Sequence, residues 1–240
     1  MPNAAIVLQA RLGSTRLPGK VLAPISGRSI LAHCVERLRA SGLPVIVATT
    51  NLDEDDRVAA EAVRAGAAVV RGSVEDVLAR YLQAATQFGL TEVVRATADN
   101  PAVDIDAAGR TLALLYRSGA DHVVEHGLPH GATVEAVTTE ALARAAGLAT
   151  AASDREHVTT LIRRDHRFFA LPALAPGALR RPSARLTVDT AADLAFMRRV
   201  FALAGAMPGA PAPLASIIAA AVRAVATPVH GDSTTASDVG

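Results

Sequence analysis

Short apolar runs alternate with longer amphipathic segments along the first half of the chain. The apolar runs have the length of buried strands, and the amphipathic segments have the length of helices. Strands are expected at residues 4–9, 44–48, 67–71 and 92–96, and helices at about 29–40, 55–65, 73–87 and 104–117. This repeated strand–helix order predicts βαβ units, and therefore an α/β fold with a mainly parallel sheet flanked by helices.

The regular order loosens after residue 119. Strands are expected at 121–125, 133–137 and 185–188, and helices at 139–149, 154–164, 191–204 and 214–225. The pattern predicts one domain over residues 1–226 with an irregular subregion at about 119–175. Residues 227–240 are small and polar, which predicts a disordered tail.

Composition narrows the class of protein further. The chain has 240 residues, of which 50% are hydrophobic, enough for one sizeable core. Its net charge of +1 argues against nucleic acid or an anionic membrane as a partner. No apolar run approaches the roughly 20 residues of a membrane helix. Cys34 is the single cysteine and cannot form an internal disulfide, so we expect a core thiol in a soluble, cytoplasmic protein.

The first strand runs into the segment QARLGSTRLPGK, which spans Gln9 to Lys20. It combines two glycines and two hydroxyl side chains with three cations, Arg11, Arg16 and Lys20, the last being the only lysine of the chain. Glycine-rich turns direct backbone N–H groups at anions, and the cations favour a polyphosphate. The spacing fits neither a Walker loop nor a dinucleotide-binding fingerprint. An ordinary basic turn is the alternative.

Two distant aspartates each follow an apolar, strand-like run. Asp99 and Asp189 are therefore expected at strand ends, where ligands of open α/β sheets gather. Together they could share one Mg²⁺, which prefers carboxylate, water and phosphate oxygens. Each aspartate alone is also typical of a turn. Asp193 is expected to form a helix capping box with Thr190.

Other polar patterns have a structural interpretation. Asp104 and Asp106 form a DxD sequence, but they lie where a helix is expected to begin, and acidic residues favour that end. Histidines at 122, 126 and 130 are interrupted by Gly127 and Pro129, so they do not share one helical face. One loop histidine near a substrate is favoured over a zinc site.

The segment from Gln9 to Lys20 resembles the opening signature of the cytidylyltransferase family, which includes enzymes that activate ketodeoxyoctulosonate and N-acetylneuraminate. The likeness is in particular to the spore-coat polysaccharide F-type branch. It continues in order over residues 4–200, through ATT (48–50), RGS (71–73), DVLARY (76–81), RATADNP (95–101), REHVT (155–159) and LTVDT (186–190).

This resemblance implies a Rossmann-like fold of the nucleotide-diphospho-sugar transferase type and roles for individual residues. It implies a nucleotide site of Gln9, Arg11, Gly13, Ser14, Arg16, Lys20, Gly72, Ser73 and Arg80. It implies Mg²⁺ on Asp99 and Asp189, which with Lys20 and Arg16 form the catalytic set. It also implies acceptor contacts from Glu135, Glu156 and His157, although Glu156 could equally cap a helix with Ser153. Asn100 and Thr133 depart from the branch, which often has Cys and Asp there.

The expected activity is Mg²⁺-dependent transfer of CMP from CTP to an acidic sugar or similar small acceptor, by in-line attack on the α-phosphate with release of pyrophosphate. Alternatives are a nucleotide-sugar pyrophosphorylase that uses another nucleoside triphosphate, a glycosyltransferase of related fold, and a non-catalytic sensor. A homodimer formed through residues 121–137 is implied by the resemblance alone.

Overall fold

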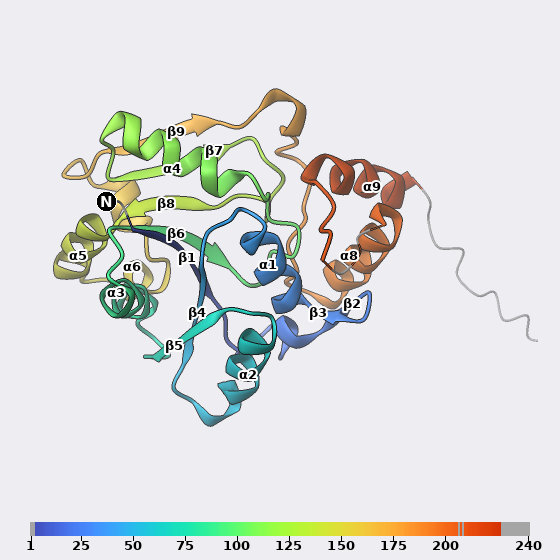
Figure 1. Ribbon diagram of the computed structural model, residues 1–240, viewed down its shortest axis with the longest axis horizontal. Helices are drawn as coiled ribbons and strands as arrows, with labels where there is room; N and C mark the ends of the chain where they lie inside the picture. Colours follow the sequence, from blue (N-terminus) through green and yellow to red (C-terminus); the bar gives the residue numbers. More distant parts are fainter. Residues whose placement is uncertain (1–2, 206, 208, 227–240) are drawn as a thin grey trace, which may run out of the picture.

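The computed structural model describes residues 3–205, 207 and 209–226, and the tail predicted at 227–240 lies outside them (Figure 1). A seven-stranded sheet with the order β5-β4-β1-β6-β8-β7-β9 forms its centre. The strands are β1 (Ala4–Gln9), β4 (Val45–Thr50), β5 (Ala68–Gly72), β6 (Glu92–Thr97), β7 (His122–His126), β8 (Glu135–Thr138) and β9 (Ala170–Leu174). The α/β class with a mostly parallel sheet is confirmed.

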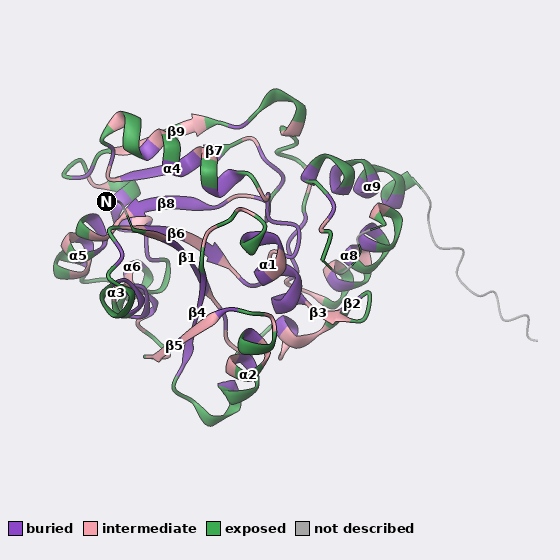
Figure 2. Cartoon of the chain, viewed as in Figure 1, coloured by how far each residue is buried: buried purple, intermediate pink, exposed green. Residues whose placement is uncertain are grey.

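The strands β5, β4, β1 and β6 form a parallel half, in the regions where short apolar runs predicted strands. All six residues of β4 are buried, and so are the middle four of β1. Burial on both faces explains why these strands have nearly continuous apolar sequences. Figure 2 shows this buried centre beneath helices whose outer sides are exposed.

Helices cover both faces of the sheet and bury two apolar clusters against it. One face carries α1 (Ile30–Arg39), α2 (Asp56–Arg64), α4 (Ala107–Ser118), α8 (Ala191–Ala204) and α9 (Leu214–Ala226). The other carries α3 (Val77–Phe88), α5 (Thr139–Leu148) and α7 (Thr160–Arg164), with α6 (Ala152–Glu156) packed against α3 and α7. Cys34 lies fully buried in the first cluster, and burial raises the pKa of its thiol, consistent with a core residue.

The second half of the sheet departs from the predicted pattern. β8 is antiparallel to β6 and β7, and β9 pairs parallel with β7 at the edge. The prediction of a strand at 185–188 is wrong, because this segment makes a single bridge, between Arg185 and His130. β9 was not predicted, since its residues are partly or fully exposed and include Pro172, so the strand lacks an apolar run.

Three helix boundaries also differ from the predictions. The single helix predicted at 154–164 is two short helices, α6 and α7, because the backbone at Val158 has a φ of 60° between them. α3 begins at Val77 rather than near Ser73, and the Asp76 carboxylate accepts the capping bond from the Ala79 amide. α4 begins at Ala107, three residues after Asp104.

Two short elements follow the predicted phosphate loop. The first is a one-turn 3₁₀ helix, η1 (Lys20–Leu22), and the second is a hairpin of β2 (Pro24–Ile25) and β3 (Arg28–Ser29). Gly19 has a φ of 70°, a left-handed conformation that favours glycine, and it turns the chain so that Lys20 starts η1. Among the described helices, none has both the length and the apolar character needed to cross a membrane.

Candidate active site

An open cleft of about 640 Å³ lies at the carboxyl ends of β1 and β6. Ligands of open α/β sheets bind at this edge. The loop after β1, the turn after β6, the segment 187–189 and the residues around α6 contribute its walls. The described residues lining it are Gln9, Ala10, Arg11, Gly13, Ser14, Thr15, Arg16, Lys20, Val21, Val77, Arg80, Arg95, Thr97, Ala98, Asp99, Asn100, His130, Glu156, His157, Thr187 and Asp189.

A buried carboxylate anchors the loop that follows β1. Asp55 is 1% exposed and accepts a 2.7 Å bond from the backbone amide of Leu12, while its second oxygen accepts from the Thr50 hydroxyl. The Gly19 amide then donates to the Leu12 carbonyl at 3.1 Å and closes the loop. These contacts place the loop cations beside the carboxyl end of the sheet.

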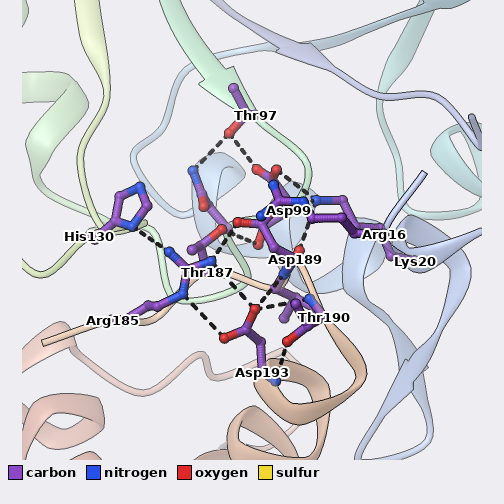
Figure 3. Close-up of polar contacts among 12 residues, drawn as sticks. Arg16, Lys20, Thr97, Asp99, His130, Arg185, Thr187, Asp189, Thr190 and Asp193 are labelled. Atoms are coloured by element: carbon purple, nitrogen blue, oxygen red, sulfur yellow. Dashed lines mark hydrogen bonds and ion pairs between the residues drawn. The ribbon is translucent and has the colours of Figure 1, made fainter. Parts of the chain in front are cut away.

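Lys20 joins the two aspartates that the sequence analysis singled out (Figure 3). Its Nζ donates to Asp99 Oδ2 at 3.0 Å, to Asp189 Oδ1 at 2.9 Å and to the Val188 carbonyl at 2.8 Å. The Lys20 side chain is 11% exposed, so one ammonium group lies between two carboxylates in a largely enclosed position. Asp99 is 79 positions from Lys20 in the sequence and Asp189 is 169 positions from it, yet both contact the Lys20 Nζ atom.

Two arginines complete the surroundings of Asp189. Arg16 Nη2 lies 2.9 Å from Oδ1, and Arg185 Nη2 lies 2.5 Å from Oδ2. Burial alone raises the pKa of Asp189, but the bonds from Lys20 and Arg185 outweigh it and lower the pKa. Arg185 also donates to His130 Nδ1 at 2.9 Å and to Asp193 Oδ1 at 3.2 Å. The carboxylate of Asp189 is therefore ionised and held by three cations.

The segment around Asp189 is tied to the turn that carries Asp99, although it is not a strand of the sheet. The Val188 amide donates to the Asp99 carbonyl at 2.8 Å, and the Thr187 hydroxyl donates to the same carbonyl at 3.2 Å. Gly131 lies against this junction, where a Cβ atom would come within 2.8 Å of the Thr187 nitrogen. The expectation that Asp189 ends a sheet strand is wrong, but the crossing segment brings it to the same edge.

A buried arginine of α3 forms part of the wall of the cleft. Arg80 is 2% exposed, donates from Nη1 to the Ala48 carbonyl at 3.1 Å, and has no partner for Nε among the described residues. Desolvation lowers the pKa of its guanidinium. Gly72 permits this placement, since a Cβ there would lie 2.9 Å from the Arg80 Cγ. Gly72 and Ser73 themselves do not line the cleft.

Glu135 lies in a buried network beside the cleft and does not line it. Its Oε1 accepts from Arg95 Nη1 at 2.6 Å, and its Oε2 accepts from Thr159 Oγ1 at 2.7 Å and lies 2.7 Å from His122 Nε2. Burial would raise the pKa of Glu135, but the charge of Arg95 and the His122 bond lower it strongly. Of the three residues expected to face an acceptor, only Glu156 and His157 line the cleft.

The DxD sequence and the spaced histidines do not form a common site. Asp104 is 3% exposed and bound to Arg110, which also forms a two-point contact with Glu125. Of the spaced histidines, His130 lines the cleft and His122 is part of the Glu135 network.

Sequence reasoning missed several residues of the cleft: Arg95, Thr97, Asn100, Thr187, and Arg185 behind Asp189. Arg95, Thr97 and Asn100 fall inside the family-like motif at 95–101. This motif was the only sequence feature that could have identified them as site residues.

The donor set suits a magnesium ion that shares its coordination with a substrate. Among the described residues, no group of three or more histidine, cysteine, aspartate or glutamate side chains could hold a metal. Asp99 and Asp189, however, both reach one atom, Lys20 Nζ. Mg²⁺ commonly binds one or two carboxylates and completes its shell with water and phosphate oxygens. The residues present therefore fit the ion.

Comparisons with known proteins agree with this geometry. A family model described as cytidylyltransferase matches residues 4–204. The spore coat polysaccharide biosynthesis protein SpsF of Bacillus subtilis is 32% identical over 216 residues, 87% of this chain and 90% of that protein. A 3-deoxy-manno-octulosonate cytidylyltransferase of Anaeromyxobacter dehalogenans is 30% identical over 61% of each chain.

The solved structure of a cytidylyltransferase from Leptospira borgpetersenii is also similar. It matches with a TM-score of 0.86 and 27% identity, over 94% of this chain and 96% of that one.

Proposed function

This chain belongs to the cytidylyltransferase family, and we propose that it transfers CMP from CTP to an acidic sugar or similar small acceptor in a Mg²⁺-dependent reaction. The observation that most supports this proposal is the contact of Lys20 with both Asp99 and Asp189 at the carboxyl edge of the sheet. These residues lie beside the loop that bears Arg11 and Arg16. Cations and metal-binding carboxylates together suit a triphosphate.

The charge of the cleft supports an anionic nucleotide. Among the described lining residues, five arginine or lysine side chains face three carboxylates. Arg80 has an unpartnered Nε, and Arg16 is 64% exposed although it pairs with Asp189. Guanidinium groups bind phosphate oxygens in a two-point manner, so Arg16 can exchange the Asp189 carboxylate for a phosphate.

In the proposed reaction an acceptor hydroxyl attacks the α-phosphorus and releases its proton to solvent, the bond from the α-phosphorus to the α–β bridging oxygen breaks, and pyrophosphate leaves. Lys20 and Arg16 stabilise negative charge that develops on the leaving pyrophosphate. Asp99 and Asp189 would hold Mg²⁺, which supplies Lewis-acid stabilisation of the phosphoryl oxygens when bound. No protein nucleophile is needed, because positioning and charge neutralisation lower the barrier.

The acceptor is proposed to bind beside His130, Glu156 and His157, which line the cleft. Arg95 also lines the cleft, with its side chain 15% exposed and Nη1 bound to Glu135, and the surplus of cations in the cleft favours an anionic acceptor. The Anaeromyxobacter relative is named for a sugar acid, 3-deoxy-manno-octulosonate, which supports the same class.

Pyrophosphate release tests the proposal. The purified chain is mixed with Mg²⁺, each of the four ribonucleoside triphosphates in turn, and a panel of acidic and neutral sugars. We expect release only with CTP and an acidic acceptor, and calorimetry should give CTP affinities of about 1 µM to 1 mM, the usual range for enzyme substrates. Equal or tighter binding of UTP or GTP would favour a pyrophosphorylase of another base.

The glycosyltransferase alternative receives no support from the site. It would require Asp104 and Asp106 to hold a metal, but Asp104 is buried against Arg110 and neither residue lines the cleft.

The expected homodimer stays a prediction. β7 and β8 are interior strands, so within residues 119–175 the outer edge of β9 is the sheet edge that a second copy could meet. Sedimentation of the purified chain tests this.

A further inference from the structure

The ammonium group of Lys20 occupies a position between the two carboxylates that are proposed to hold the metal. It lies 3.0 Å from Asp99 Oδ2 and 2.9 Å from Asp189 Oδ1, and a third bond goes to the Val188 carbonyl. Three acceptors match the three donors of an ammonium group. A cation is thus already present where a divalent ion would contact both carboxylates.

Both carboxylate oxygens of Asp189 also have cationic partners already. Lys20 and Arg16 both contact Oδ1, and Arg185 contacts Oδ2. A divalent ion approaching this carboxylate would meet two positive charges on the same oxygen. Metal and lysine therefore compete for one place, since like charges a few ångströms apart repel strongly.

We propose that Lys20 fills the metal position in the free protein, so that a divalent ion binds tightly only when a polyphosphate draws Lys20 away from the carboxylates. This inference rests on the proposed function for the identity of the polyphosphate, CTP. It predicts that metal and nucleotide strengthen each other's binding, because each removes an obstacle to the other.

The three cations around Asp189 differ in how readily they can move. Lys20 has a flexible four-carbon stem and needs only to turn its ammonium toward the loop. Arg16 is 64% exposed and has no other ion pair among the described residues, so phosphate can attract it as well. Arg185 is held by His130 and by Asp193, so it stays and orients Asp189 through the exchange. Arg185 is thus a positioning residue.

Titration of the full chain with Mn²⁺ alone, followed by the paramagnetic signal of the free ion, tests the inference without any reaction. The wild-type protein should bind Mn²⁺ weakly. Lys20→Met removes the ammonium and leaves two carboxylates facing each other, so we expect Mn²⁺ to bind on the order of tenfold more tightly, within the usual range of coupling between sites. Mn²⁺ should also raise the melting temperature of this variant more than that of the wild type.

Two matched variants show which residues provide the gained affinity for Mn²⁺. Lys20→Met/Asp189→Asn should lose the gained affinity, which would assign it to the paired carboxylates. Arg16→Met removes a cation from the same oxygen but leaves the ammonium between the carboxylates, so its gain should be much smaller. Should Lys20→Met fail to fold, Lys20→Gln keeps a donor for the Val188 carbonyl without the charge.

Wild-type and Lys20→Met proteins of equal Mn²⁺ affinity would overturn the inference, and so would an equal gain in Arg16→Met. Calorimetry with CTP separates this result from the proposed function. If CTP binds while Lys20→Met gains no affinity for Mn²⁺, the role of Lys20 is wrong and the function stands. If the gain appears but CTP does not bind, the nucleotide is wrong and the competition between lysine and metal stands.

Discussion

Two networks of charged side chains lie next to each other in this protein and differ in what surrounds them. We call them the cleft network, formed by Arg16, Lys20, Asp99, Asp189 and Arg185, and the buried network, formed by Arg95, His122, Glu135 and Thr159. Both connect segments that are distant in sequence. Only the cleft network has its central groups at the open wall of the cavity.

In the buried network the carboxylate of Glu135 is fully occupied, although Arg95 Nε and His122 Nδ1 have no hydrogen-bond partner among the described residues. Both oxygens of Glu135 have short contacts with neighbouring side chains, and Glu135 is 7% exposed, so no ligand can reach its carboxylate without displacing one of them. In the cleft network three cations surround the one carboxylate of Asp189, and Arg16 remains largely exposed. A buried carboxylate with both oxygens paired stabilises the fold, whereas a network with surplus positive charge beside a cavity can exchange partners with a ligand.

Removing a carboxylate of the cleft network is the strongest test of the difference between the two networks, because the effect is expected on activity. Asp189→Asn and Asp99→Asn should each lower kcat/KM by about 10³-fold, about 4 kcal/mol, because a shared metal contact is lost. The two effects should not multiply in the double variant, since either loss already disrupts the shared ion. Steady-state pyrophosphate release with CTP measures this, with circular dichroism to check folding.

Asp104→Asn provides a contrast, because Asp104 is buried but outside the cleft. Its effect should fall on stability, through the bond to Arg110, and leave turnover nearly unchanged. Near-normal activity in Asp189→Asn, or losses that simply multiply in the double variant, would contradict a shared site.

A change of cation shape at Lys20 should have the next largest effect. Lys20→Arg keeps the charge but spreads it over a planar fork that cannot reproduce the compact contact of an ammonium group with the phosphates, so we expect a loss of about 10²-fold in activity. The loss should appear in kcat as well as in kcat/KM, because the lysine acts on charge that develops in the transition state. Rates of pyrophosphate release over a range of CTP concentrations give both constants.

Arg198→Lys is the matched control. Arg198 is exposed and donates from Nε to the Pro24 carbonyl at 2.9 Å, so exchanging the two cation types there should have little effect on activity. Wild-type turnover of Lys20→Arg would mean that the loop is an ordinary basic turn.

Much of the parallel half was predictable from sequence because burial on both faces leaves an apolar run in each strand. β1 matches its predicted bounds, and so does α8 at 191–204, where Thr190 and Asp193 form the expected capping box. The cations of the loop after β1 and the two aspartates were identified through their motifs. Their meeting at Lys20 Nζ could not be predicted, since it depends on segment 185–190 crossing the turn after β6.

The irregular half was less predictable because tertiary contacts override local pattern there. β9 takes its place through pairing with β7 and not through an apolar run. Glu135 illustrates the same limit. Its position in a family-like segment implied an acceptor contact, but strand alternation on β8 directs it to Arg95 and His122. A pattern of residue types does not distinguish a closed network from an open one.

Removing the charge of Glu135 tests how much the buried network contributes to the stability of the fold. Glu135→Gln should lower the free energy of unfolding by about 2 kcal/mol, the usual contribution of hydrogen bonds to a charged group. Because the folded pKa lies below the ordinary value of a glutamate, its stabilisation is present above about pH 4.5 and is lost as the pH falls further. Urea denaturation between pH 3 and pH 7 should show a smaller acid-side loss in Glu135→Gln.

Glu75→Gln is the control for this change, because Glu75 is exposed on the surface. Its effect on unfolding should be near zero. A Glu135→Gln protein as stable as Glu75→Gln would mean that the buried network contributes nothing to the fold.

The smallest expected effect concerns Asp193, which supports the cleft network from behind. Its Oδ2 accepts from the amides of Asp189 and Thr190 at 2.9 Å each, and its Oδ1 accepts from Arg185. Burial raises the pKa of Asp193, but the Arg185 bond and the backbone bonds outweigh this and hold the pKa at about 2. Its contribution to stability is therefore complete above about pH 4 and is lost as the pH falls toward 2.

Asp193→Asn keeps an oxygen for the backbone amides but removes the charge that holds Arg185. We expect a loss of about 1 kcal/mol in the free energy of unfolding, as for a weakened helix cap. We also expect a several-fold fall in kcat with an unchanged KM for CTP, because Arg185 then orients Asp189 less firmly. Denaturation at pH 7 and steady-state kinetics on the same preparation measure both. A change in stability with fully normal kcat would show that Arg185 positions Asp189 without help from Asp193.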